Sequence, residues 1–245
     1  MNVYLLMGTH LPELGTCLDA LARQCPPGAP VQWHIPDGIS WQSTGPEGTE
    51  VNFYSADEVQ WVFNPDEEAS IFILLDPRVP QIPQLETIAG DLQKCLIEPL
   101  KVITCVDCEA AETSVHLRAW LEANVYYSDI VLLGNRSKAS KSFVRDFQKT
   151  YEKNCYPCLF LFLKGKGIPS QPLEILTPDT RRLSQLFDLK ENGGEEIPGL
   201  IIEASCDLDM EEPERDPYRA PDEEAGRTKA PVPDINEFIV QLPGQ

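Results

Sequence analysis

Strand-like apolar runs alternate with stretches of helical periodicity along the first 190 residues, and this alternation most constrains the fold. Strand patterns lie at Val3–Met7, Ile71–Leu75, Lys101–Val106, Ile130–Leu133 and Leu159–Leu163. Helix patterns lie at Leu11–Gln24, Leu85–Leu96, Ala110–Asn124 and Ser140–Lys153. Apolar runs without polar alternation are typical of parallel strands that are buried on both faces. The sequence therefore predicts an α/β domain with a mostly parallel sheet and helices on both faces.

Weaker patterns complete this expectation. Short strands are predicted at Val31–Ile35, Val51–Tyr54 and Val59–Phe63, and a short helix at Thr180–Phe187. The proline-laden stretch Pro77–Pro83 is predicted to be a loop, because proline interrupts regular backbone hydrogen bonding.

The first strand pattern ends at Gly8, and a helix pattern follows, which is the frame of a phosphate-binding loop. A working loop reads glycine, four residues, glycine, lysine, and then serine or threonine. Its amides cradle the phosphates, the lysine neutralises them and the hydroxyl holds magnesium. Counted from Gly8 without gaps, the second glycine falls on Glu13, the lysine on Leu14 and the hydroxyl on Gly15. The frame is present, while the residues that bind phosphate are missing.

The charge of the chain limits its partners. A net charge of −19 at pH 7 argues against a nucleic-acid backbone or an anionic membrane. No run of about 18 apolar residues is present, so no segment is expected to span a membrane. The first apolar run lacks a preceding basic segment, which favours a strand over a signal peptide. We therefore expect a cytoplasmic chain whose eight cysteines are mostly reduced thiols.

Composition divides the chain into three parts. Residues 1–190 have the pattern of one α/β domain. Residues 191–234 are rich in Glu, Asp, Pro and Gly, and such a segment buries too little apolar surface to offset its chain entropy, which predicts an acidic linker or tail. Residues 235–245 regain apolar character, as expected of either a docking peptide or a last strand on the parent domain.

Three segments carry a resemblance to a known family. Lys101–Cys108 resembles a strand that ends in Val-Asp-Ala, Tyr127–Leu133 resembles a strand reading Ala-Asp-Arg-Ile-Leu-Leu, and Pro178–Asp188 resembles a segment that closes a GTPase domain. Over roughly residues 1–189 the chain resembles the nucleotide-binding domain of the CobW family of metal-chaperone GTPases, which is related to HypB and UreG. The resemblance implies a P-loop NTPase-like fold, with GTP and magnesium as ligands and a role in metal trafficking.

Each functional motif of that family is altered in this chain. Asp76 falls on an acidic position of the family's Glu-Thr-Ser-Gly-Leu-Ala-Asp-Pro motif, but Val79 replaces the glycine that senses the γ-phosphate. The base-reading Asn-Lys-x-Asp is replaced by Gly134–Lys138, which contains no aspartate. The family's Cys-x-Cys-Cys metal motif and its C-terminal domain are absent. The resemblance leaves a vestigial nucleotide-binding set of Gly8, Gly15, Thr16, Asp76, Asn135 and Lys138.

Two cysteine pairs raise other hypotheses. Cys105-x-x-Cys108 and Cys155-x-x-Cys158 together offer four thiolates, which suit Zn²⁺. However, the first pair follows one strand and the second precedes another, which places the pairs on opposite edges of a parallel sheet and favours buried, apolar-like cysteines. Cys155–Cys158 also has thioredoxin-type spacing, but that motif normally follows a strand and opens a helix.

Charged residues near strand ends offer further candidates. Asp76 and Asp107 each end a predicted parallel strand, where they would either hold a metal at the carboxyl edge of the sheet or cap a helix. A local basic group follows Ile130–Leu133, and it is either a solvated face or an anion site; its members are Arg136, Lys138, Lys141 and Arg145.

The sequence favours a pseudo-GTPase over an enzyme. Loss of the loop lysine and the magnesium hydroxyl removes the electrostatic stabilisation that phosphoryl transfer requires. We expect a binding or regulatory scaffold with a protein partner, and without catalytic residues, a resident metal or a cofactor. One alternative is a divergent GTP- or ATP-binding metal-trafficking protein that uses magnesium and a replacement residue such as Lys138. Another is a structural subunit that docks onto a larger assembly through its acidic tail.

Overall fold

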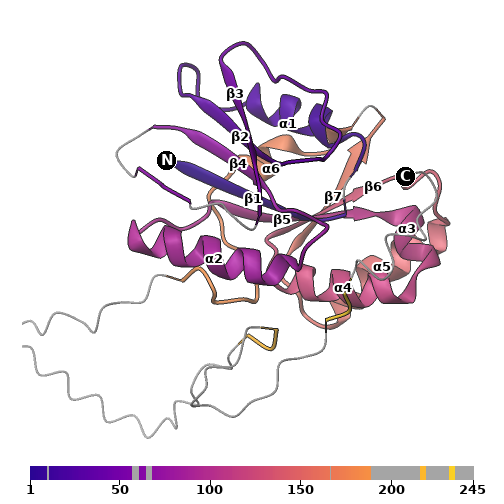
Figure 1. Ribbon diagram of the computed structural model, residues 1–245. Helices are drawn as coiled ribbons and strands as arrows, with labels where there is room; N and C mark the ends of the chain where they lie inside the picture. The colour runs from indigo at the N-terminus through magenta and orange to yellow at the C-terminus, as the bar shows by residue number, and fades with distance from the viewer. Residues whose placement is uncertain are drawn as a thin grey trace, which may run out of the picture.

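In the computed structural model, eight strands form one sheet in the order β3-β2-β4-β1-β5-β6-β7-β8 (Figure 1). Every adjacent pair is parallel except β7 with β8, which is antiparallel. The structure describes residues 1–9, 11–56, 61–64, 68–165, 167–188, 216–218 and 232–234. The expected α/β fold with a mostly parallel sheet is confirmed.

The strands follow the predicted apolar runs closely. They are β1 Asn2–Gly8, β2 Val31–Pro36, β3 Thr49–Tyr54, β4 Ser70–Leu74, β5 Lys101–Asp107, β6 Ile130–Gly134, β7 Leu159–Lys164 and β8 Ile168–Pro169. All residues of β4 and β6 are buried, as are nearly all of β1 and β5. These four strands have neighbours on both sides and helices on both faces, which explains why their sequences are apolar without alternation.

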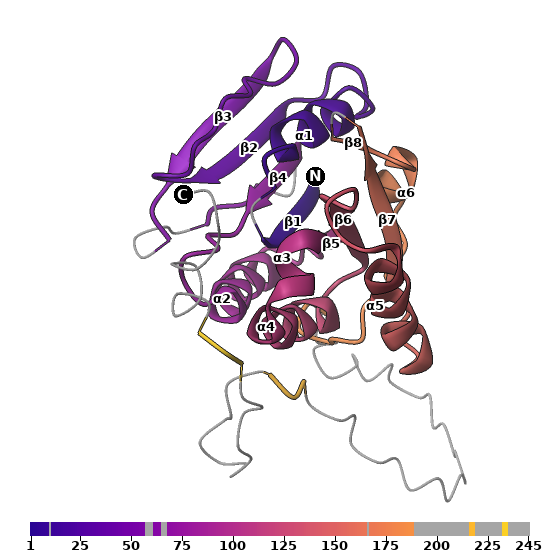
Figure 2. The same ribbon diagram turned by 90° about the vertical axis from the view of Figure 1, so that its right-hand side faces the viewer.

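Helices cover both faces of the sheet (Figures 1 and 2). The structure assigns α1 Leu14–Ala22, α2 Gln81–Lys94, α3 Cys108–Thr113, α4 Val115–Tyr126, α5 Lys141–Lys153 and α6 Pro172–Leu176. Helices α1 and α6 lie on one face, where their apolar side chains join a cluster around Leu6, Phe72 and Ile103. Helices α2 to α5 lie on the other face over two further clusters. Both faces of the sheet are therefore core.

Several predicted boundaries are wrong for identifiable reasons. Helix α2 begins at Gln81 rather than Leu85, because Pro83 occupies the first turn, where its missing N–H costs nothing. The helix predicted over Ala110–Asn124 is two helices, since Ser114 ends one and caps the next by accepting a hydrogen bond from the Leu117 amide at 3.1 Å. Of the strand predicted at Val59–Phe63, the described part has no regular structure.

The segment predicted as a helix at Thr180–Phe187 is instead an irregular strap held by charge. Lys101 is fully buried and its ammonium contacts Asp179. Asp129, also fully buried, accepts hydrogen bonds from the Arg181 amide at 2.7 Å and from Nη1 of Arg182 at 3.0 Å. These contacts fix the strap at the amino edge of β5 and β6. Partners 52 to 78 residues away thus override the local helical pattern.

Two short pieces of the acidic segment pack on the domain. Asp216 accepts hydrogen bonds from the Ser184 hydroxyl at 2.5 Å and from the Gln185 amide at 3.2 Å. The Tyr218 ring lies 5.6 Å from that of Tyr126, and Val232 contacts the apolar clusters under α2 and α4. Residues 191–234 were predicted to be a linker or tail, and most of them, like residues 235–245, lie outside the described residues.

Candidate functional site

The phosphate-loop frame lies at the carboxyl edge of the sheet, where β1 separates the two halves of the strand order. In open α/β sheets this switch point is where ligands bind. Gly8, the last residue of β1, has φ +94°, and a Cβ there would lie 2.2 Å from the carbonyl oxygen of Cys105. Its amide donates a hydrogen bond to Oε1 of Gln81 at 2.8 Å. Glycine is required at this position by the close approach of β5.

The residues after Gly8 are tied to β5 rather than arched over a ligand. The Thr9 amide donates to the Cys105 carbonyl at 2.8 Å, and the Thr9 hydroxyl accepts from the Asp107 amide at 2.7 Å. Leu11 is fully buried, and its Cδ1 would lie 2.8 Å from a Cβ on Gly134 of β6. An isobutyl group therefore covers the ends of the central strands.

The start of α1 is likewise filled by protein side chains. Leu14, at the position of the family's lysine, is fully buried in the core cluster with Leu11 and Leu18. Oε2 of Glu13 is buried and has no hydrogen-bond partner among the described residues. A buried carboxylate oxygen at this place would repel a phosphate. Gly15 packs against Ser43, and Thr16 is exposed on α1.

The predicted acidic positions are occupied by structural contacts. Asp76 is buried and forms an ion pair with Arg78, whose Nε and Nη2 lie 2.9 Å and 2.7 Å from its two carboxylate oxygens. This pairing raises the pKa of Arg78 above its ordinary value. Arg78 also donates to the carbonyl of Asp37, which joins the end of β4 to the loop after β2. Asp76 thus holds the Arg78 guanidinium, which in turn links the loop after β4 to the loop after β2.

Asp107 and Asn135 form a second structural contact at the same edge. Asp107 caps α3 by accepting from the Ala110 amide at 3.1 Å, and its other oxygen accepts from Nδ2 of Asn135 at 2.6 Å. The capping role predicted for a strand-terminal aspartate is therefore present. Lys138 lies in the next turn, with its ammonium 3.2 Å from Glu109, and both side chains are exposed.

The first of the two cysteine pairs considered for zinc is split between the two faces of the sheet. Cys105 lies in the cluster under α1, whereas Cys108 lies in the cluster under α4 on the opposite face. Burial raises the pKa of Cys105, Cys108 and Cys158 to about 12. Within the described ranges, no group of three or more His, Cys, Asp or Glu side chains has the arrangement of a metal site.

The vestigial set therefore does not form one site. Gly8, Asp76 and Asn135 lie at the carboxyl edge, but each has a structural role, while Gly15 and Thr16 belong to α1 and Lys138 is paired on the surface. At the positions of the family's lysine and magnesium hydroxyl stand Leu14 and Gly15, so the described residues do not fit a magnesium–nucleotide as this fold class would hold one.

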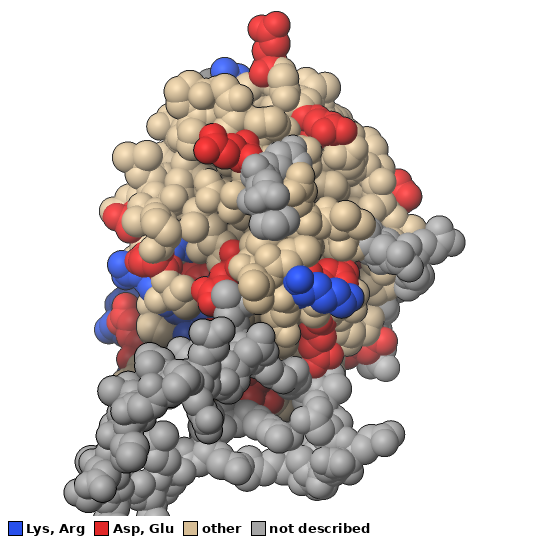
Figure 3. All heavy atoms as spheres, turned by 90° about the vertical axis from the view of Figure 1, so that its left-hand side faces the viewer, with Lys and Arg blue, Asp and Glu red and all other residues tan. Residues whose placement is uncertain are grey.

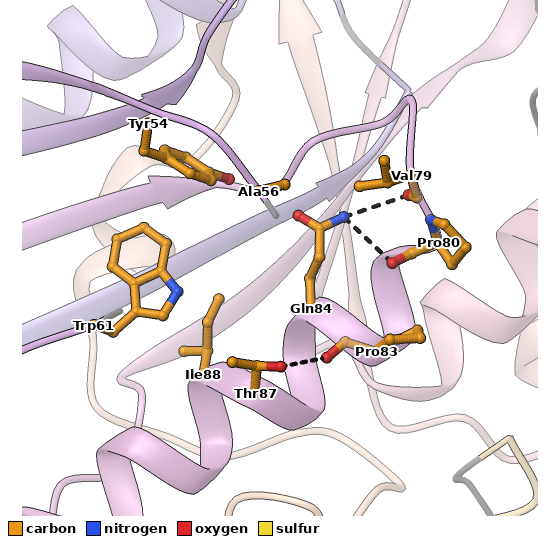
Figure 4. Close-up of a pocket in the computed structure, with 9 residues that line it drawn as sticks. All are labelled: Tyr54, Ala56, Trp61, Val79, Pro80, Pro83, Gln84, Thr87 and Ile88. Atoms are coloured by element: carbon orange, nitrogen blue, oxygen red, sulfur yellow. Dashed lines mark hydrogen bonds between the residues drawn. The ribbon is translucent and has the colours of Figure 1, made fainter. Parts of the chain in front are cut away.

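A cavity beside this edge was not predicted. It has a volume of about 210 Å³ and lies between the end of β3, the segment around Trp61 and the first half of α2 (Figure 4). Its lining residues are Tyr54, Ala56, Trp61, Val79, Pro80, Pro83, Gln84, Thr87 and Ile88. The walls come from parts of the chain that are distant in sequence, so no local sequence pattern predicts the cavity.

Sequence reasoning also missed Gln81, which holds the turn at Gly8. Gln81 is buried, and its Oε1 accepts from both the Gly8 amide and Nδ2 of Asn124 at 3.2 Å. The signal that could have found it is the pair Pro80 and Pro83, because prolines gather at the first turn of a helix.

On the face in Figure 3, which is the side of the N-terminus in Figure 1, charged side chains of both signs are dispersed among uncharged ones. Of the helices among the described residues, none combines the length and the hydropathy needed to cross a bilayer.

The similarity of this chain to known proteins is distant. No protein-family model matches the chain, and no curated protein matches it. Among solved structures, the Zn(II)-bound YjiA GTPase from E. coli is similar, with a TM-score of 0.41 and 16% sequence identity. The match covers 64% of this chain and 55% of the YjiA chain, so this chain spans about half of that protein.

Proposed function

We propose that this domain is a pseudo-GTPase: a P-loop NTPase-like fold that does not hydrolyse nucleotide and acts as a binding scaffold for a protein partner. The observation that carries the proposal is the closed turn after β1. Leu11 and Leu14 are both fully buried there, and the Thr9 amide is already bonded to Cys105. Phosphate would have to displace these contacts without gaining a lysine or a hydroxyl in return.

The energetic comparison supports this proposal. A phosphate loop works because several backbone N–H groups have no protein partner and point at the ligand. Here the amides of Gly8, Thr9 and Leu14 donate to protein oxygens at 2.8, 2.8 and 3.0 Å. Opening the turn would also expose two leucine side chains, at a cost of about 1.5–3 kcal/mol each. The free energy of nucleotide binding would have to offset this cost.

The test is direct titration of the full-length chain. We expect isothermal titration calorimetry with GTP or ATP and magnesium to give no saturable heat, and phosphate release to stay at the rate of the buffer. A P-loop GTPase run in parallel shows that the assay detects binding. Micromolar affinity or turnover above the blank would refute the proposal. A partner that co-purifies in fixed stoichiometry and is unaffected by GTP would support the scaffold half of it.

A divergent nucleotide-binding metal-trafficking protein is the second candidate, and Lys138 favours it. The Lys138 side chain is 59% exposed and its ammonium pairs with exposed Glu109, an interaction of about 0–1 kcal/mol. An anion could recruit such a lysine at little cost. If calorimetry detects nucleotide, Lys138→Ala should weaken binding while Lys149→Ala, on the exposed face of α5, should not. Equal affinities would exclude Lys138 as the replacement.

A further inference from the structure

In the wall of the cavity beside α2, the side chains of Gln84 and Thr87 are already hydrogen-bonded. Nε2 of Gln84 donates to the carbonyls of Asp76, Val79 and Pro80 at 2.9, 3.3 and 3.3 Å, and its Oε1 accepts from the Asp76 amide at 2.9 Å. The Thr87 hydroxyl donates to Pro83 at 3.0 Å (Figure 4). An occupant therefore gains little from hydrogen bonding to these side chains.

The remaining wall is apolar and aromatic. The Tyr54 and Trp61 rings meet edge to face, with centroids 5.0 Å apart, and the Tyr54 hydroxyl donates to the Leu74 carbonyl at 2.6 Å. None of the described lining residues carries a charge. At about 210 Å³, the cavity is smaller than the roughly 300–1,000 Å³ of sites for drug-sized ligands. Its size and lining fit one or two apolar side chains of a peptide.

The chain itself carries such a peptide close by. Val232 packs against the apolar cluster that contains Ile88 of the cavity wall, and Trp61 packs against the same cluster. The sequence then continues Ile235-Asn236-Glu237-Phe238-Ile239-Val240-Gln241-Leu242. Phe238 is one of two aromatic residues after Phe187, and the other, Tyr218, already packs on Tyr126 and Tyr127.

The reach of this segment matches the distance to be covered. Helix α2 has 14 residues and so is about 21 Å long. An extended chain covers about 20 Å in the six residues from Val232 to Phe238. A side chain at position 238 can therefore lie anywhere along α2, including beside Thr87 and Ile88. Residues 200–202 are also apolar, but they contain no aromatic residue and precede the anchor at Asp216.

We propose that residues 235–242 dock intramolecularly in the cavity formed by Tyr54, Trp61, Pro83 and Thr87, with Phe238 as the inserted side chain. The cavity then serves as an apolar peptide site that the chain's own end occupies, and a partner peptide would have to displace it. This inference is independent of whether the domain binds nucleotide.

Hydrogen exchange on the full-length chain tests the docking. Phe238→Asp places a charge in an apolar site, and Asn236→Asp adds the same charge at a polar position two residues earlier. We expect Phe238→Asp to increase exchange in residues 50–64 and 79–90, and Asn236→Asp to leave it unchanged. Equal exchange in the wild type and both variants would overturn the proposal.

A second measurement keeps the proposal falsifiable if the exchange signal is broad. A labelled peptide of residues 232–245 is titrated onto the wild type and onto full-length Phe238→Asp. The vacated cavity of the variant should bind the peptide at least about tenfold more tightly, because the tethered segment competes at high effective concentration in the wild type. Adding Thr87→Arg to the variant should remove this binding.

Oligomeric state distinguishes docking in one chain from exchange between two. Sedimentation of the wild type should show a monomer at all concentrations at which residues 50–64 are protected. A dimer that disappears in Phe238→Asp would place the segment on a second copy and overturn the intramolecular proposal.

Discussion

Leu14→Lys restores the residue that a phosphate loop requires. The variant distinguishes two interpretations of the turn after β1: a closed part of the core, or a nucleotide site that has been weakened. In the structure Leu14 is fully buried at the first turn of α1 and packs in the core cluster with Leu11 and Leu18. A lysine there loses the apolar contacts of leucine and brings an ammonium into the same space. Control variants are Leu173→Lys, on α6 with its side chain 64% exposed, and Leu14→Met, which conserves volume.

The expected cost follows from burial. Removing a buried leucine side chain costs about 2.7–5.0 kcal/mol, and a buried charge without a partner adds to this unless the side chain reaches water. We expect Leu14→Lys to lower the free energy of unfolding by about 3–5 kcal/mol, a large part of the roughly 5–15 kcal/mol of a typical domain. Leu173→Lys should change it by less than about 0.5 kcal/mol, and Leu14→Met by less than about 1.5 kcal/mol.

Urea unfolding followed by far-ultraviolet circular dichroism, with and without magnesium and GTP, measures these differences. If the turn were a phosphate site that lacks only its lysine, Leu14→Lys would be tolerated and GTP would raise its unfolding midpoint. A ligand at a hundred times its Kd adds about 2.7 kcal/mol. A loss below about 1 kcal/mol, or a GTP-dependent midpoint, would refute the assignment of Leu14 to a closed core.

Three further predictions concern the strap and the thiols. Asp129→Asn should cost about 3–5 kcal/mol in urea unfolding because it breaks a fully buried ion pair, whereas Asp146→Asn on the surface should cost less than about 0.5 kcal/mol; similar costs would contradict the buried pair. Hydrogen bonds from Lys101 of β5 and then from Arg181 of the strap hold the pKa of Asp179 below its ordinary value of 3.8. The stabilisation from this carboxylate is therefore present above that pH and is lost as the pH falls through the lowered pKa. The stability difference between the wild type and Asp179→Asn should therefore be larger at pH 6 than at pH 2, and a constant difference would contradict this reasoning. Cys155 is exposed and should react with a thiol reagent at pH 8 well before Cys158, whose pKa is raised to about 12; equal rates would refute the burial of Cys158.

The strands were predictable because burial on both faces leaves a local trace. Leu5 and Ile103 lie in runs whose residues are apolar on both faces of the sheet. These strands could therefore be predicted without knowing which elements pack against them. The cap at Ser140, whose hydroxyl accepts from the Phe143 amide at 3.2 Å, is local in the same sense.

The rest of the fold and the site depended on distant partners. The strap at 179–187 looks helical in sequence, but Lys101 and Asp129 hold it in another conformation. The absence of a phosphate lysine was readable at Leu14. The sequence did not show that Leu11 covers the strand ends, because its contact, Gly134, lies more than 120 residues away. The cavity at Tyr54 and Trp61 could not be predicted for the same reason, because its walls come from parts of the chain that are distant in sequence.

The anchor at Asp216 has an electrostatic consequence. In the sequence, residues 189–215 lie between Asp188 and Asp216, and Asp and Glu far outnumber Lys and Arg among them. Asp216 is bonded to Ser184 and Gln185. Asp188 and Asp216, the described residues that flank this acidic segment, are both bonded to the strap, which lies at the amino edge of the sheet, opposite the turn at Gly8. Negative charge carried between these two anchors would speed the encounter with a cationic probe, and the encounter rate would fall as salt increases.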